Sequence, residues 1–257
     1  MADAKKSDLP VRAASAVAMV AVAGAALWLG GWFWIMFVAA IALGVLWEWW
    51  ELVSAFESRP WSQSLWLIGG VFYVGLGAVV LAEPAIRDIE FAKMNPENAA
   101  SLAIWARFSV ILPLLAAIVA TDVGAYFAGR LIGGPKIAPR ISPSKTWAGL
   151  IGGMVASSLT FATVNWKLDS DWSPDTYWFF AAVGAIIAIV AQTGDFFESW
   201  MKRRAGVKDS GKLIPGHGGL FDRVDGLLAV CFVIALISLG TVASVLLSGG
   251  SMLPSPE

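Results

Sequence analysis

The sequence has little charge and few of the residues that build most soluble active sites. Asp, Glu, Lys and Arg make up 14% of its 257 residues, against about 25% in ordinary soluble domains. It has one histidine and one cysteine, which excludes an intramolecular disulfide, a cysteine zinc cluster and a histidine-rich metal site. The formal net charge of −1 excludes a globally basic nucleic-acid-binding protein. Cys231 lies in an apolar run, so we expect it to be a small buried hydrophobe.

Apolar residues dominate what is present. They account for 58% of the chain, and the mean hydropathy is +0.70. A soluble globule of this size cannot hide so much apolar surface, because its outside must stay polar. Residues 13–47 and residues 226–256 carry no charged side chain. Three further uncharged runs have 19 to 23 residues. About 20 apolar residues cross a bilayer as a helix, so these runs predict membrane spans.

We predict an all-α polytopic membrane protein with about seven transmembrane helices. Gly30-Gly31 divides the first long run into a helical hairpin. The segment 101–133 is predicted to be one long, kinked or broken helix, because Pro113 interrupts it. Only helices satisfy their backbone in lipid without closing a barrel. The predicted spans are residues 12–29, 32–54, 63–82, 102–129, 147–165, 176–197 and 225–247.

The basic residues predict the orientation of these spans. With seven spans and the N-terminus in the cytoplasm, fourteen of the eighteen Lys and Arg residues lie in cytoplasmic segments. Such a bias is typical of inner (plasma) membrane proteins that follow the positive-inside rule. We therefore expect a multi-pass protein with a cytoplasmic N-terminus and its polar, chemically active side facing the cytoplasm.

The first polar region runs from Thr121 to Gly149. Asp122, Tyr126 and Arg130 are spaced four residues apart, so they share one face of a helix. The loop that follows carries three basic residues and no acid. One interpretation is a positive-inside anchor that contacts lipid headgroups. The other is an anion site, because a carboxylate at membrane depth needs a partner or an ion.

The second polar region covers residues 192–226. Gln192, Asp195 and Ser199 would share a helix face, and a glycine-rich turn follows at residues 215–219. Carboxylates on both sides of a basic, glycine-rich loop suit a divalent cation that is shared with phosphates. The alternative is a solvated juxtamembrane loop. His217, the single histidine, is flanked by three glycines, and we expect it to contact a substrate.

The stretch from Ser199 to Asp225 resembles the signature of the phosphatidate cytidylyltransferase (CDP-diacylglycerol synthase) family. The family pattern is S-x-x-K-R, then K-D, then P-G-H-G-G and D-R-x-D, and every fixed position is present in register over 27 residues. Upstream, TDVGAYFAGR, SPSKTWAG and QTGD also resemble family segments. The resemblance covers about residues 105–245, and the region around Trp47-Glu48-Trp49 is similar more loosely.

The resemblance implies transfer of a cytidylyl group from CTP to phosphatidic acid, with magnesium as cofactor and a second cation left open. It implies that the metal ligands are Asp195, Asp222 and, as a weaker candidate, Asp122. The implied catalytic residues are Lys202, Lys208, Asp209, His217, Arg223 and Asp225. The implied substrate-binding residues are Lys145, Ser199, Arg203, Gly218 and Gly219.

The expected partners are CTP, phosphatidic acid and the lipid bilayer, with a homodimer left open. Residues 1–100 would form three spans, fewer than in longer family members, and residues 101–257 would form the catalytic region of one structural domain. Two alternatives remain. One is another CTP-using lipid nucleotidyl- or phosphotransferase. The other is an ion-coupled transporter in which Asp122 and Asp195 bind the ion.

Overall fold

The computed structural model describes residues 9–94, 99–168, 173–214 and 218–247. Within these residues, seven helices are long and apolar enough to cross a membrane, which confirms the predicted all-α membrane fold and its seven spans. The elements are α1 (Leu9–Leu29), α2 (Gly31–Phe56), α3 (Pro60–Met94), α4 (Ala99–Leu131), β1 (Lys136–Ala138), β2 (Ser142–Thr146), α5 (Trp147–Leu168), α6 (Pro174–Ala205) and α7 (Phe221–Leu247).

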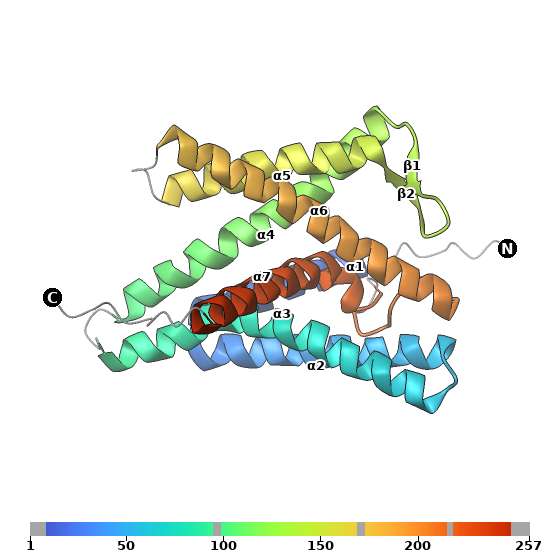
Figure 1. The fold of residues 1–257 in the computed structure, drawn as a ribbon, viewed down its shortest axis with the longest axis horizontal. Coiled ribbons are helices and arrows are strands. Elements are labelled where there is room, and N and C mark those ends of the chain that lie inside the picture. The colour runs from blue at the N-terminus through green and yellow to red at the C-terminus, as the bar shows by residue number, and fades with distance from the viewer. Residues whose placement is uncertain (1–8, 95–98, 169–172, 215–217, 248–257) are drawn as a thin grey trace.

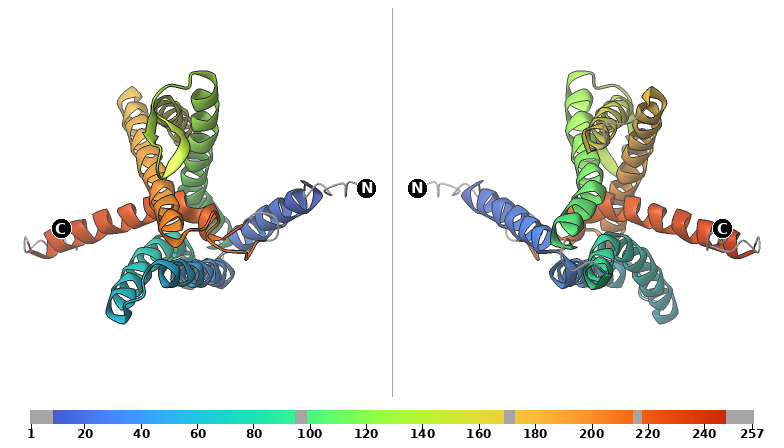
Figure 2. Two further views of the ribbon diagram at one scale, coloured as in Figure 1. Left: turned by 90° about the vertical axis from the view of Figure 1, so that its right-hand side faces the viewer. Right: turned by 90° about the vertical axis from the view of Figure 1, so that its left-hand side faces the viewer.

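The helices form two groups on opposite sides of α7. Helices α4, α5 and α6 lie on one side, and α2 and α3 lie on the other (Figure 1). The beginning of α1 and the end of α7 point away from the bundle in opposite directions (Figure 2). Their outer surfaces are apolar and exposed, as at Val20 and Ile237. Such surfaces suit contact with lipid chains rather than water.

One end of the molecule carries most of the polar structure. The strands β1 and β2, the end of α6 and the beginning of α7 lie together there, and α1 also begins at this end (Figure 1). We call it the hairpin end. The end of α7 lies at the opposite end of the molecule, which we call the far end.

Small residues allow α4 and α5 to pack closely. A Cβ atom on Gly124 would lie 2.6 Å from the carbonyl oxygen of Gly152, and one on Gly152 would lie 2.2 Å from the Cβ of Ala128. Close backbone approach is a main source of helix association in lipid, where no hydrophobic effect drives it. The two helices therefore form a closely packed pair that carries one wall of the site described below.

The predicted break at Gly30-Gly31 is confirmed. Gly30 has a φ of 62°, which favours glycine, and α1 and α2 meet there. The guanidinium of Arg107 lies against this turn, donates to the Trp28 carbonyl at 3.0 Å and pairs with the buried carboxylate of Asp88. These contacts join α1, α3 and α4 away from the hairpin end.

Helix α3 is longer than the predicted span 63–82. It continues through Pro84 to Met94, so Asp88 lies in a helix rather than in an outer loop. The buried pair with Arg107 explains how a carboxylate can lie in this part of the helix. Helix α4 continues through Pro113 as one element, in line with a single long passage.

The basic loop after α4 contains a two-stranded antiparallel hairpin that the sequence analysis did not predict. Both strands are edges, so Pro143 in β2 is tolerated there. Arg203 Nε donates to the Ile141 carbonyl at 3.2 Å, which attaches the hairpin to α6. Thr146 Oγ1 accepts from the Gly149 N–H at 3.0 Å and caps the start of α5.

An aromatic core lies beneath the polar residues of the hairpin end. Trp49 of α2 is 2% exposed, and its ring lies within 6.3 Å of four others. This cluster joins α2, α3, α6 and α7, so it holds the end of α6 against the beginning of α7. Cys231 is fully buried, as predicted. The four neighbouring rings are those of Trp66, Tyr73, Phe197 and Phe221.

Candidate active site

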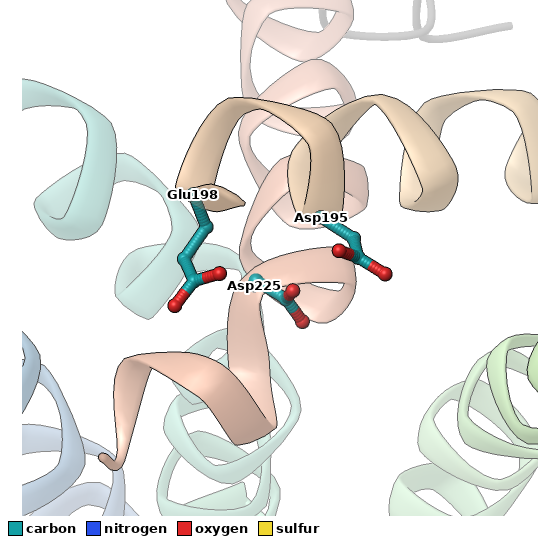
Figure 3. A group of neighbouring side chains, drawn as sticks. All are labelled: Asp195, Glu198 and Asp225. Atoms are coloured by element: carbon teal, nitrogen blue, oxygen red, sulfur yellow. The ribbon is translucent and has the colours of Figure 1, made fainter. Parts of the chain in front are cut away.

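Three carboxylates meet where α6 passes α7 (Figure 3). Asp195 and Glu198 are three residues apart on α6, so they face the same side. Asp225 comes from the beginning of α7, and one oxygen of each residue lies within 4.8 Å of the other two. Gly194 permits this approach, because a Cβ there would lie 2.6 Å from the Asp225 carbonyl oxygen. We call these three residues the carboxylate cluster.

Glu198 is the most buried member of the carboxylate cluster, with 1% of its surface exposed. Its Oε2 lies 2.6 Å from Lys202 Nζ, while no described residue forms a hydrogen bond with its buried Oε1. A buried carboxylate oxygen without a partner is costly. Carboxylate oxygens are the ligands that Mg²⁺ prefers. The cluster therefore offers the oxygen ligands that a divalent cation prefers. Such a cation would also give the buried Glu198 Oε1 a partner.

The hairpin brings Lys145 to this cluster. Lys145 Nζ lies 2.5 Å from one oxygen of Asp195, and Ser199 Oγ lies 3.3 Å from the other. The ammonium also lies 4.6 Å from the centre of the Phe196 ring. The structure thus brings Lys145 to Asp195 and Ser199, which the sequence had placed on one helix face in a separate segment.

A cavity of about 350 Å³ lies beside Asp195, between α4, the hairpin and α6. Asp122, Tyr126 and Arg130 line it from one face of α4, as their spacing predicted, and Arg130 donates to the Tyr126 hydroxyl at 2.6 Å. Gln192 also lines it. This side chain is 6% exposed, and its Nε2 has no hydrogen-bond acceptor among the described residues. The cavity thus has basic, acidic and amide groups on its walls.

Asp222 lies close to the carboxylate cluster but is not one of its three members. Its Oδ2 accepts from Ser210 N at 2.8 Å, Ser210 Oγ at 3.0 Å and Gly219 N at 3.0 Å. Its Oδ1 lies 2.5 Å from Lys202 Nζ. Lys202 therefore bridges Asp222 and Glu198. In these contacts Asp222 closes the loop between α6 and α7, and its role as a metal ligand stays a prediction.

The other described residues that were predicted for the site lie in or beside the loop between α6 and α7. Lys208 and Asp209 are exposed and line a second cavity, of about 640 Å³, between α2 and the loop after α6. Gly218 has a φ of 81° and lies against Asp209. Arg223 is exposed at the start of α7. His217 lies outside the described residues.

Three residues of this arrangement were missed by the sequence analysis. Glu198 lies one turn after Asp195, and that spacing is the signal that would have found it. Ser210 lies inside the matched signature but at a position that the pattern leaves open. Glu48 lies on α2, and its carboxylate accepts from Ser210 Oγ at 2.8 Å. No local pattern predicts a contact across 162 residues.

Comparison with known proteins assigns the family. The model of the "Cytidylyltransferase family" matches residues 101–239, which is more than half of the chain. The chain belongs to the cytidylyltransferase family. This confirms the resemblance that the signature indicated. The matched region contains α5, α6 and all three residues of the carboxylate cluster.

Several cytidylyltransferases named as acting on phosphatidate are similar along most of the chain. The phosphatidate cytidylyltransferase of Brucella melitensis is 36% identical over 256 residues, which cover 90% of this chain and 93% of that protein. The phosphatidate cytidylyltransferase of Haemophilus influenzae is 32% identical, over 80% of this chain and 84% of that protein. The phosphatidate cytidylyltransferase of Rickettsia bellii is 29% identical, over 92% of this chain and 93% of that protein. The similarity to the Brucella protein therefore extends beyond the cytidylyltransferase match, into the N-terminal spans.

Proposed function

We propose that this cytidylyltransferase-family enzyme transfers a cytidylyl group from CTP to phosphatidic acid, which forms CDP-diacylglycerol and releases pyrophosphate. The names of the relatives support the reaction. The observation that carries it in the structure is the carboxylate cluster beside a cavity lined by Lys145, with a Glu198 oxygen that has no hydrogen-bond partner among the described residues. This arrangement provides for a cation and for phosphates at one end of a membrane-spanning bundle.

The chemistry asks for charge neutralisation more than for a general base. An oxygen of the phosphatidate monoester attacks the α-phosphorus of CTP, a new P–O bond forms, and the bond to the β-phosphate oxygen breaks as pyrophosphate leaves. The monoester has a second pKa near ~6, so it is largely dianionic at neutral pH. A dianion must approach a polyanionic triphosphate. Catalysis therefore depends mainly on positioning and on electrostatic stabilisation.

The carboxylate cluster is the proposed cation site. Asp195, Glu198 and Asp225 would hold magnesium, and Asp122 faces the same cavity as Asp195. Magnesium bound there would neutralise charge on the phosphate oxygens. Asp222 was predicted as a metal ligand, and that role stays a prediction. Its contacts support a different role, in which it organises the loop and Lys202.

Basic residues that line two cavities would bind the phosphates. Lys145 reaches the first cavity, and Lys208 lines the second. Arg203 and Arg223 are exposed at the same end. Lys202 differs from these residues, because its ammonium lies between two carboxylates and its side chain is 14% exposed. We assign Lys202 to holding Glu198 and Asp222 in place, and the others to substrate phosphates.

Replacing Lys145 or Lys208 by Ala should lower cytidylyl transfer at least tenfold. That loss corresponds to about 1.4 kcal/mol of transition-state stabilisation. Thermal stability without substrate should change little for Lys208, because this side chain is exposed in the loop. The rate of pyrophosphate release from purified protein measures the effect. Full activity in both variants would mean that these residues act only as topology anchors.

We also propose that the hairpin end faces the cytoplasm, in the inner membrane of the cell. Helix α1 begins at the hairpin end (Figure 1), where most of the basic residues lie. CTP would reach the site from the cytoplasm. Phosphatidic acid would reach it laterally, because its acyl chains leave the bilayer only at a cost of ~0.8 kcal/mol per CH₂ group.

Cysteine labelling in intact cells tests this orientation. A cysteine at Asp175, in the first turn of α6, should react with an impermeant thiol reagent from outside, while one at Lys212 should not. The native Cys231 is buried and contributes little background. In inverted membrane vesicles only the cysteine at Lys212 should react, and after permeabilisation both should react, as a control for accessibility. The reverse pattern would contradict the orientation and the cytoplasmic site.

The reaction itself is tested with purified protein and CTP labelled in the α-phosphate. Phosphatidic acid should accept the label in a magnesium-dependent reaction, with one pyrophosphate released for each lipid labelled. Labelling of a different lipid phosphate, with none of phosphatidic acid, would favour the related CTP-using transferase. Ion-driven flux into liposomes without CTP turnover would favour the transporter.

A further inference from the structure

Glu48 is a buried carboxylate outside the region that the family model matches. It lies on α2 and is 0% exposed. Its Oε1 accepts from Leu220 N at 2.8 Å, and its Oε2 accepts from Phe221 N at 2.8 Å and from Ser210 Oγ at 2.8 Å. Two of these donors are backbone N–H groups at the start of α7, where helices leave such groups unpaired. The carboxylate therefore caps α7 from another helix.

The loop between α6 and α7 fits closely around this carboxylate. A Cβ on Gly211 would lie 2.3 Å from Glu48 Oε1, and a Cβ on Gly219 would lie 2.6 Å from Oε2 and 1.9 Å from Ser210 Oγ. A side chain at either glycine would therefore displace the carboxylate or the loop. The two ends of the loop, at Ser210 and at Gly219, are thus both held against α2 by the Glu48 carboxylate.

The same contacts lead to the residues that form the cation site. Ser210 N and Oγ lie 2.8 and 3.0 Å from Asp222 Oδ2, so Ser210 contacts both Glu48 and Asp222. The hydroxyl has one proton and donates to one of these carboxylates at a time. Asp222 then pairs with Lys202, and Lys202 pairs with Glu198. Each link is a direct polar contact.

We infer that Glu48 is a positioning residue of the cytidylyl-transfer site. It touches no reacting atom. It fixes the loop and the first turn of α7, and through them the placement of Asp222 and Lys202 beside the carboxylate cluster. The N-terminal spans thereby contribute a required group to a site whose other residues lie in the matched region. The catalytic part of this inference rests on the proposed function, whereas its structural part does not.

The test compares Glu48→Gln with Glu90→Gln. Glutamine has nearly the shape of glutamate, but its NH₂ group must face either the Leu220 or the Phe221 N–H, so one donor loses its acceptor. Glu90 is exposed near the end of α3, away from the hairpin end. A third variant, Ser210→Ala, removes the hydroxyl that contacts both carboxylates.

Two measurements are made on each purified variant. The first is kcat and KM for CTP, per folded molecule. The second is the rate of tryptic cleavage after Lys208 and Lys212, which are exposed in the loop, relative to cleavage elsewhere. We expect Glu48→Gln to lower kcat at least tenfold with KM within about twofold, and to speed loop cleavage about fivefold or more. Glu90→Gln should match the wild type, and Ser210→Ala should change both quantities in the same direction as Glu48→Gln.

Wild-type kcat and loop cleavage in Glu48→Gln would overturn the inference. So would a loss of activity that only follows the folded fraction while loop cleavage stays unchanged. If Glu48→Gln does not fold, Ser210→Ala decides, and wild-type values in that variant would overturn the inference. Failure of the proposed function is distinguishable, because the wild type and Glu90→Gln would then transfer no cytidylyl group, while the cleavage measurement would still report on Glu48.

Discussion

Asp195→Asn and Asp225→Asn should each lower magnesium-dependent cytidylyl transfer at least a hundredfold, while both variants still insert and fold. Asn is nearly isosteric with Asp but removes a negative charge from the carboxylate cluster, whose oxygens lie within 4.8 Å of one another. A hundredfold loss is about 2.7 kcal/mol of transition-state stabilisation. Pyrophosphate release measures the loss, and Asp175→Asn, at the other end of the same helix α6, is the matched control.

The double variant separates a shared role from independent ones. Because Asp195 and Asp225 would act on one ion, the double variant should be little worse than either single variant. Multiplicative losses would argue for separate roles. Near-normal, magnesium-dependent activity in either single variant would remove that residue from the proposed cation site.

Asp222→Asn should also lower transfer at least a hundredfold, for a reason that the contacts specify. Four donors converge on the Asp222 carboxylate: Ser210 N, Ser210 Oγ, Gly219 N and Lys202 Nζ. An amide NH₂ would face at least one of them, which leaves a donor unpaired in a partly buried site. Lys202 would lose a charged partner, and its hold on Glu198 would weaken.

The measurement for Asp222→Asn is again pyrophosphate release, combined with the thermal midpoint in detergent. We expect a lower midpoint together with the loss of activity, because the loop and the start of α7 lose a common acceptor. Excess magnesium should not restore the rate. Restoration by magnesium at an unchanged midpoint would instead show that Asp222 acts as a direct metal ligand. Wild-type activity would exclude it from the site.

The spans were predictable because a membrane restricts the backbone to few solutions. Uncharged runs and Gly30-Gly31 were enough to place seven helices and the break between α1 and α2. The length of α3 was not predictable from hydropathy. Asp88 is charged and was therefore placed outside the membrane, but a buried pair with Arg107, 19 residues away, compensates for that charge.

The candidate site was predictable only where its residues lie in one local pattern. Spacing placed Asp122, Tyr126 and Arg130 on one face, and all three line one cavity. Spacing alone could not choose between Asp222 and Asp225 as the neighbour of Asp195, because they lie three residues apart near the start of α7. The choice depends on how α6 and α7 pack at Gly194.

Long-range polar contacts could not be predicted from the sequence for the same reason. The short strands around Pro143 give no strand signal, yet they bring Lys145 to Asp195. Glu48 entered the sequence analysis only as part of the loosely similar Trp47-Glu48-Trp49 segment, with no role assigned. Its three donors come from segments 162 to 173 residues away. A sequence pattern specifies local geometry, whereas these contacts depend on tertiary packing.

The most direct test of the central claim, that the carboxylate cluster holds the catalytic cation, is a change of ligand and metal together. In Asp225→Cys, a soft thiolate replaces a hard carboxylate oxygen, so magnesium should bind poorly while the softer cadmium or zinc binds better. The account predicts that this variant loses at least a hundredfold in pyrophosphate release with magnesium, and recovers at least tenfold with cadmium or zinc, while neither metal stimulates the wild type above its magnesium rate. Wild-type activity of Asp225→Cys with magnesium would contradict it.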